Sequence, residues 1–255
     1  MKFVVCIENA FDVTQSFQIV ENTQEVVNYS QILNPWDEFA IEAAILQKEK
    51  MECEIIVLAI GLEDCEKSLR NAFAMGCDCM VRIDADANNL THQQISKILS
   101  AALQKIGGVD LVFLGKKSID YETGTIPTML AHQLNLPFIA DVSTIEEIDP
   151  RRLIAAFQIE QEKVRAEVSL PAVISINKDF AEPRFPSFLG TRKAAKTPVQ
   201  VFTLQDLSIQ SVYQPEKEFT LTEIPQRNIR TEIIQGENAE EIVSKLENKL
   251  FGAAI

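Results

Sequence analysis

The chain has 255 residues, of which 46% are apolar, so it can bury the core of one large domain with an appendage. Its formal net charge of −13, with no run of Lys or Arg longer than two residues, argues against a nucleic-acid partner. No apolar run approaches membrane-spanning length, and the apolar start is too short for a secretion signal. We therefore expect a cytoplasmic protein without membrane insertion, whose partners are proteins or small molecules.

The first part of the chain alternates strand-like and helix-like segments. Lys2–Ile7 predicts a buried strand, and Asn34-Pro35 opens a helix in which Pro stands where its missing N–H does no harm. A second strand is expected at Glu54–Ile60, followed by an amphipathic helix over Cys65–Met75. Gly76 ends that helix, because glycine takes the left-handed conformation of a helix end without strain.

The alternation continues to residue 134. Cys79–Ile83 predicts the third strand, and a helix runs from Thr91 to Gly107-Gly108. A strand at Leu111–Leu114 and a helix carrying Met129–Leu134 follow. Strands and helices alternating at this spacing indicate right-handed crossovers, so we predict an α/β fold with a mainly parallel sheet flanked by helices.

The pattern then changes. Leu153–Ile159 and Val164–Leu170 are strand-like runs separated by polar residues, which indicates an antiparallel hairpin, and Pro171–Ile176 predicts one more strand. We assign residues 1–203 to the α/β domain.

The remainder, residues 204–255, is predicted to be an extended C-terminal arm that ends in a helix. Leu204–Glu237 is polar and shows little periodicity. Ala239–Phe251 has an apolar stripe that must be buried, either on its own domain or on another chain.

Three loops of the predicted sheet are candidates for a ligand site. They follow Ile7, Ile60 and Leu114, at the strand ends where open α/β sheets bind ligands. Gly61 belongs to the second loop. The third, Gly115–Pro127, is rich in small and hydroxyl-bearing residues, and its backbone N–H groups and the following helix dipole favour an anion such as a phosphate.

Within the third loop, individual residues suggest roles. Asp120 is a candidate acceptor for a ribose hydroxyl, or a cap for the following helix. Thr123, Gly124 and Thr125 are candidates for holding a phosphate through N–H and hydroxyl donors. The alternative is a plain helix start with a Thr as its N-cap.

Residues for catalysis or metal binding are not evident. The five cysteines are odd in number and lack CxxC spacing, so we expect reduced thiols. Cys77-Asp-Cys79 is interpreted as two small residues entering a buried strand, with a redox or metal handle as the less favoured alternative. His92 and His132 are interpreted as solvated residues on polar helix faces, and no hydrolase, phosphate-loop lysine or zinc motif occurs.

Four stretches are distinctive. They are Asn34-Pro-Trp-Asp-Glu38, Arg70-Asn-Ala-Phe-Ala-Met-Gly-Cys-Asp78, Gly115-Lys-Lys-Ser-Ile-Asp-Tyr-Glu-Thr123, and Leu170-Pro-Ala-Val-Ile174 with Glu182-Pro-Arg-Phe185 and Lys193-Ala194. In this order, over nearly the whole chain, they resemble the small (β) subunit of electron transfer flavoproteins. The resemblance implies a Rossmann-like (adenine nucleotide alpha hydrolase-like) fold with the antiparallel hairpin and an extended C-terminal arm.

The resemblance also implies a function. The β subunit is the non-catalytic half of a heterodimer, and its arm embraces the α subunit, whose FAD carries electrons from acyl-CoA or other dehydrogenases to a quinone reductase. The β subunit itself holds AMP or a second FAD. By position, the cofactor-binding residues would be Cys6, Asn34, Ile60, Gly61, Asp120, Thr123, Gly124 and Thr125.

A further implication concerns residues 183–196. They correspond to the family's recognition loop for the client dehydrogenase, with Phe188 and the adjoining Leu189 at its apolar anchor. The alternative is that Phe185, Phe188 and Leu189 pack onto their own domain.

The chain departs from the family pattern near the expected phosphate. Pro127 removes a backbone donor, Glu8 stands where family members tend to have Lys, and Glu160-Gln161-Glu162 replaces an acidic-Gly-Gly turn. We therefore expect a divergent member. A stand-alone adenine-nucleotide-binding enzyme or stress-type regulator, and a scaffold without nucleotide, remain alternatives.

Overall fold

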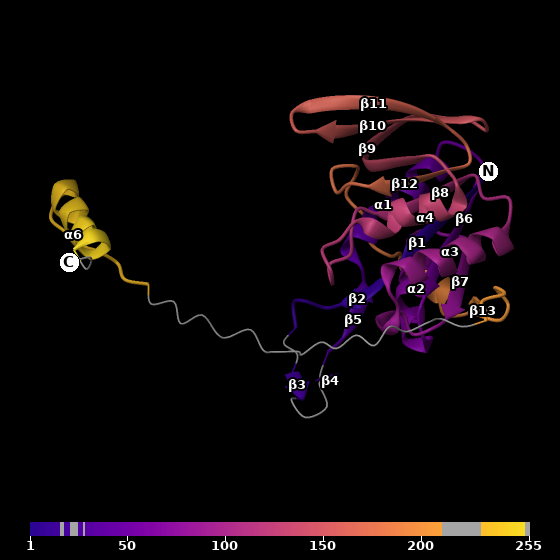
Figure 1. Cartoon of the computed structure of the whole chain (residues 1–255), viewed down its shortest axis with the longest axis horizontal. Helices are drawn as coiled ribbons and strands as arrows, with labels where there is room; N and C mark the ends of the chain where they lie inside the picture. Colours follow the sequence, from indigo (N-terminus) through magenta and orange to yellow (C-terminus); the bar gives the residue numbers. More distant parts are fainter. Residues whose placement is uncertain (16–17, 21–24, 28, 211–230, 253–255) are drawn as a thin grey trace.

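The computed structural model describes residues 1–15, 18–20, 25–27, 29–210 and 231–252, and Figure 1 shows the whole chain. The strands are β1 (Lys2–Ile7), β2 (Asn9–Phe11), β3 (Gln18–Val20), β4 (Glu25–Val27), β5 (Gln31–Leu33), β6 (Glu54–Ile60), β7 (Cys79–Asp84), β8 (Leu111–Gly115), β9 (Phe138–Ile148), β10 (Arg152–Ile159), β11 (Glu162–Ser169), β12 (Ala172–Ile176) and β13 (Gln200–Thr203). The helices are α1 (Pro35–Lys48), α2 (Glu66–Met75), α3 (His92–Ile106), α4 (Thr125–Leu134), α5 (Phe188–Ala194) and α6 (Ala239–Phe251), with short 3₁₀ helices at Glu63–Cys65 and Ala87–Asn89.

In the described part of the chain, the main sheet has nine strands in the order β11-β10-β9-β12-β8-β1-β6-β7-β13. Pairing is parallel from β9 to β13 and antiparallel between β9, β10 and β11. The chain proceeds from β1 to β6 and β7 in one direction, and β8 then pairs with the opposite edge of β1. This reversal leaves a crevice at the carboxyl ends of β1 and β8, where an open sheet binds its ligand.

Helices cover both faces of the sheet, as Figure 1 shows. Successive residues of a strand point to opposite faces, so Phe3 and Val5 of β1 pack with α1 and α2, whereas Val4 and Cys6 pack with α3 and α4. The parallel strands are therefore apolar on both sides, as the continuous apolar run at the start of the chain predicts.

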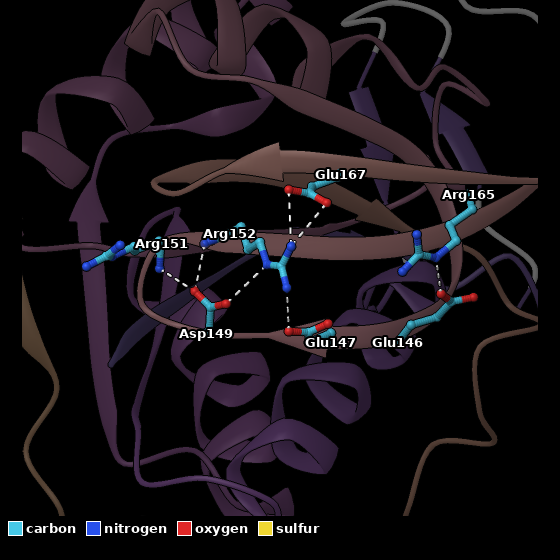
Figure 2. A network of polar contacts seen from close by, with 7 residues as sticks. All are labelled: Glu146, Glu147, Asp149, Arg151, Arg152, Arg165 and Glu167. Carbon is cyan, nitrogen blue, oxygen red and sulfur yellow. Dashed lines mark hydrogen bonds and ion pairs between the residues drawn. The ribbon is translucent and has the colours of Figure 1, made fainter.

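An ion-pair network lies on the antiparallel extension of the sheet (Figure 2). Arg152 of β10 contacts Glu147 of β9 at 2.9 Å, Asp149 in the turn at 3.3 Å and Glu167 of β11 at 3.4 Å. These side chains are partly exposed, so each pair stabilises the fold little by itself. Their placement on three neighbouring strands supports the pairing of the hairpin with β9.

The α/β prediction, the parallel sheet and the antiparallel hairpin are confirmed, and β1, β6 and α6 have the predicted bounds. The short strands β2 to β5, and also β9, α5 and β13, were not predicted from the sequence. The helix that carries Met129–Leu134, for which the pattern gave no start, is α4 and begins at Thr125.

Much of the predicted arm, residues 211–230, lies outside the described residues. Leu207, just after the predicted domain boundary, is buried in the core beside β13. In α6 the apolar side chains of Val243, Leu250 and Phe251 are exposed, and the helix has no buried residue. No helix among the described residues is long and apolar enough to cross a membrane.

Candidate functional site

A cleft lies at the carboxyl ends of β1, β6 and β8, beside the starts of α1, α3 and α4. Its lining consists of Cys6, Ile7, Glu8, Asn9, Asn34, Asp37, Ile60, Ala87, Asn88, Leu90, His92, Ile95, Leu99, Leu114, Gly115, Lys117, Ser118, Asp120, Tyr121, Thr123, Ile126 and Pro127. Five of the candidate cofactor-binding residues are among them: Cys6, Asn34, Ile60, Asp120 and Thr123. The loops after Ile7 and Leu114 line the cleft, whereas the segment after β6 contributes only its strand end, Ile60.

The other three candidates border the cleft without lining it. The Gly61 N–H donates to the Ile83 carbonyl at 3.0 Å, and a Cβ at Gly61 would stand 2.6 Å from the Cβ of Cys65. Gly61 thus shapes the turn after β6. Gly124 is the N-cap of α4, where a Cβ would stand 2.8 Å from the Lys116 carbonyl oxygen, and Thr125 is the first residue of that helix.

Asp37, which the sequence reading did not single out, joins two of the converging strands. It lies in the first turn of α1, and its Oδ2 accepts the Glu8 N–H at 2.8 Å while its Oδ1 accepts the Gly115 N–H at 3.0 Å. A single buried carboxylate therefore ties the end of β1 to the end of β8, and it fixes the floor of the cleft.

Carboxyl groups cluster at this floor. Burial raises the pKa of Asp37 to about 8, and the neighbouring Glu8 adds to the rise. Burial likewise raises the pKa of Glu8 to about 7, opposed by a hydrogen bond with Ser118 and supported by the charge of Asp120. Asp120 accepts the Phe11 N–H at 2.9 Å, and burial raises its pKa despite this bond. The floor therefore holds protons near neutral pH and offers hydrogen-bond acceptors.

Asn34 adds an acceptor to the same floor. Its side-chain Nδ2 donates to the Lys117 carbonyl at 3.0 Å, which holds the loop after β8 in place. The side chain is buried, yet its Oδ1 has no hydrogen-bond partner among the described residues. A buried acceptor without a partner is costly, so this atom is suited to an N–H or O–H donor from a ligand.

The start of α4 is not capped by a Thr, which was the predicted alternative to a phosphate site. The N-cap is Gly124, which provides no side-chain hydrogen bond. Pro127 is the third residue of the helix and is buried. Its missing N–H leaves Thr125 and Ile126 as the helix residues before it that can offer backbone donors to an anion.

His92 was predicted to be a solvated residue on a polar helix face, and in the structure it is half-buried. It is the first residue of α3 and lines the cleft. Its Nδ1 and the Thr125 Oγ1 are 2.9 Å apart, and its ring stands edge-on to Tyr121 with centroids 5.4 Å apart. Its position at a helix start could have predicted this place, because the helices that follow parallel strands begin at the ligand-binding edge of the sheet. His132 is exposed on α4, as predicted.

The segment of the predicted recognition loop is anchored at its base and exposed at its tip. Arg184 contacts the buried Glu42 through Nε and Nη2, both at 2.8 Å, and Glu49 at 2.8 Å. Ser187 caps α5 by accepting the Gly190 N–H. Phe188 and Leu189 are 77% and 74% exposed, and Phe185 is exposed too, so they do not pack onto their own domain as the alternative required.

The cysteines are free thiols, of which Cys6, Cys65 and Cys77 are buried. Burial raises the pKa of Cys65 and of Cys77 to about 12, so both thiols stay protonated. Among the described residues, no group of three or more His, Cys, Asp or Glu side chains has an arrangement that would hold a metal ion.

Comparison with known proteins places this fold in a family. Residues 26–207 match the model of the electron transfer flavoprotein domain. The chain is 31% identical over 255 residues to the electron transfer flavoprotein subunit beta of Bacillus subtilis, covering 98% of each chain. It is 26% identical over 253 residues to the subunit of the same name from Mus musculus, covering 97% of each. It is also 29% identical over 213 residues to the caffeyl-CoA reductase-Etf complex subunit CarD of Acetobacterium woodii, covering 82% of this chain and 80% of that one.

The family match covers most of the chain, and the similarity to the Bacillus protein extends from one end to the other. The chain belongs to the electron transfer flavoprotein family, as a β subunit.

Proposed function

We propose that this chain is the nucleotide-holding half of a heterodimeric electron carrier. In this proposal it binds AMP or FAD in the cleft, and it pairs with an α subunit whose FAD passes electrons from a dehydrogenase to a quinone reductase or another acceptor. The chain supplies no catalytic residue of its own. The observation that carries the proposal is the cleft at the β1 and β8 ends, in a chain that belongs to the β-subunit family.

The residues of the cleft fit the adenosine part of such a nucleotide. Asn34 Oδ1 and the carboxyl groups of Glu8 and Asp120 provide acceptors for the amino group of adenine and the hydroxyls of ribose. The apolar side chains of Ile60, Leu99 and others of the lining suit the flat face of a base. The family's flavin, when bound, would supply the redox chemistry.

The partner surfaces proposed for the chain lie outside the cleft. Residues 204–255 are proposed to clasp the α subunit, and the exposed apolar side chains of α6 support this, because such a stripe gains stability when a partner covers it. Phe188 and Leu189 are proposed to insert into the client dehydrogenase. The name of the Acetobacterium relative favours a client that acts on a CoA thioester.

Co-expression with an α-type subunit tests the proposal. We expect the two chains to co-purify as a yellow one-to-one complex that a dehydrogenase reduces. A colourless, stable monomer that hydrolyses nucleotide would instead support the stand-alone enzyme.

A scaffold that has lost its nucleotide is the second candidate, because Pro127 and the three carboxyl groups weaken the site for a phosphate. A yellow complex from which only the α subunit's FAD is released on denaturation would support it.

A further inference from the structure

The cleft is charged unevenly. Glu8, Asp37 and Asp120 lie on the side formed by β1, α1 and the loop after β8. The starts of α3 and α4 lie on the other side, where helix dipoles place partial positive charge. The start of α1 also lies on the first side, but Pro35 has no N–H and Asp37 occupies its first turn. The first side therefore offers mainly hydrogen-bond acceptors and the second offers N–H donors, so the cleft orients a nucleotide with its phosphate on the second side.

The two helix starts offer different donors. In α3, Thr91 and Gln94 form a capping box, in which the Thr91 side chain accepts the Gln94 N–H and the Gln94 side chain accepts the Thr91 N–H. One backbone N–H of the first turn of α3, that of Gln94, is therefore already bonded within the helix start and is not offered to a ligand. In α4 the N-cap is a glycine without a side-chain bond, but Pro127 removes one donor. The backbone alone gives a weak anion site, and a side chain must complete it.

Two basic side chains are found among the described residues that line the cleft, Lys117 and His92. The Lys117 ammonium already pairs with Glu122 and lies over the Trp36 ring, 5.3 Å from its centroid. His92 stands between the two helix starts, held by its hydrogen bond with the Thr125 hydroxyl and by the edge of Tyr121. Its ring is thus positioned where the phosphate of an oriented nucleotide would lie.

We propose that His92 of α3 binds the phosphate of the adenine nucleotide, acting with Thr125 and the first turn of α4, while Asn34 and the carboxyl groups bind the adenosine. The inference rests on the proposed function, in which the cleft holds an adenine nucleotide. It assigns to a side chain of α3 the hydrogen-bond donor for the phosphate that Glu8 does not supply at the end of β1.

Calorimetric titration of the nucleotide-free heterodimer with AMP and with adenosine tests the assignment. His92→Ala should weaken AMP binding by about ten-fold or more, the usual effect of losing a hydrogen bond to a charged group, and should change adenosine binding by less than about two-fold. His92→Gln, which keeps an N–H donor, should recover part of the loss. His132→Ala, an exposed histidine on α4, is the matched control and should bind both ligands as the wild type does.

The outcomes separate the two claims. If the wild type binds AMP, and His92→Ala weakens AMP and adenosine equally or weakens neither, the assignment of His92 is overturned while the nucleotide function stands. If the wild type binds neither AMP nor adenosine nor FAD, the nucleotide function fails and the assignment fails with it.

Discussion

Glu8 and Asp37 are the residues whose protonation couples the cleft to pH. Both carboxyl groups have a pKa raised mainly by burial, to about 7 and about 8. The folded chain therefore holds protons that the unfolded chain has already released, and raising the pH favours unfolding. The contribution of these protonated carboxyl groups to the free energy of unfolding is fully present below the ordinary carboxyl pKa. It is lost as the pH rises through the raised pKa values of the folded chain.

We predict that the free energy of unfolding falls as the pH rises from about 5 to about 8, and that Glu8→Gln makes this fall smaller by about 1–2 kcal/mol. Urea titrations at both ends of the range measure it. Glu63→Gln, at an exposed carboxylate, is the control and should keep the wild-type slope. A wild type that becomes more stable towards pH 8 would show that these carboxyl groups are ionised in the fold.

Much of the cleft could be predicted from single residues, and some of it could not. Apolar runs marked where the parallel strands end, at Ile7, Ile60 and Leu114, whereas Cys6 came from the resemblance to the family. Asp37 was missed because its role depends on two backbone N–H groups from distant strands. His92 was missed because a polar residue in a helix pattern is assigned to the solvent-exposed face. At the start of α3, however, this polar residue lines the cleft.

At the scale of elements, the base of the proposed recognition loop depends on Arg184. Glu42 is buried, and removing its partner would leave a carboxylate without compensation, a cost that the partial exposure of Arg184 reduces. We predict that Arg184→Ala lowers the free energy of unfolding by about 1–2 kcal/mol, measured by urea denaturation. Lys196→Ala, at an exposed position just beyond α5, is the control; equal effects of the two substitutions would contradict the anchoring role.

The tip of the same loop should act on the partner and not on the fold. Phe188 is 77% exposed, so Phe188→Ala removes little buried area within the chain. We predict an unchanged melting temperature, an intact heterodimer, and reduction by the client dehydrogenase slowed by about ten-fold or more, since apolar anchors carry much of the energy of small interfaces. Stopped-flow flavin reduction measures the rate, and wild-type kinetics would remove Phe188 from the interface.

The missed elements have local explanations. In β9 the buried residues Ile139, Val142 and Ile145 are three apart, because bulges interrupt the pairing with β10 and Asp141 takes a positive φ of 55°. That spacing does not show the alternation of a strand. The seven-residue helix α5 depends on its Ser187 cap and on packing against α2, and neither leaves a periodic pattern.

At the scale of the whole molecule, the α/β domain and the arm should be separable. The described residues of α6 include none that are buried, whereas Leu207 is buried in the domain core. Because α6 has no buried residue, we predict that a chain ending at residue 210 keeps the melting temperature of the full chain within about 2 °C, which corresponds to about 1 kcal/mol or less. The same chain should lose its complex with the α subunit in size-exclusion chromatography.

A truncated chain that unfolds at a much lower temperature would show that the arm packs on its own domain. One that still forms the complex would show that the α subunit is held elsewhere.

The central claim is that the cleft of this β subunit holds an adenine nucleotide beside the flavin of its α partner. Mass spectrometry of the ligands released by denaturing the purified heterodimer tests it most directly. We predict one AMP and one FAD per heterodimer, or two FAD. Release of a single FAD with no second nucleotide, from a complex still able to accept electrons, would contradict the claim.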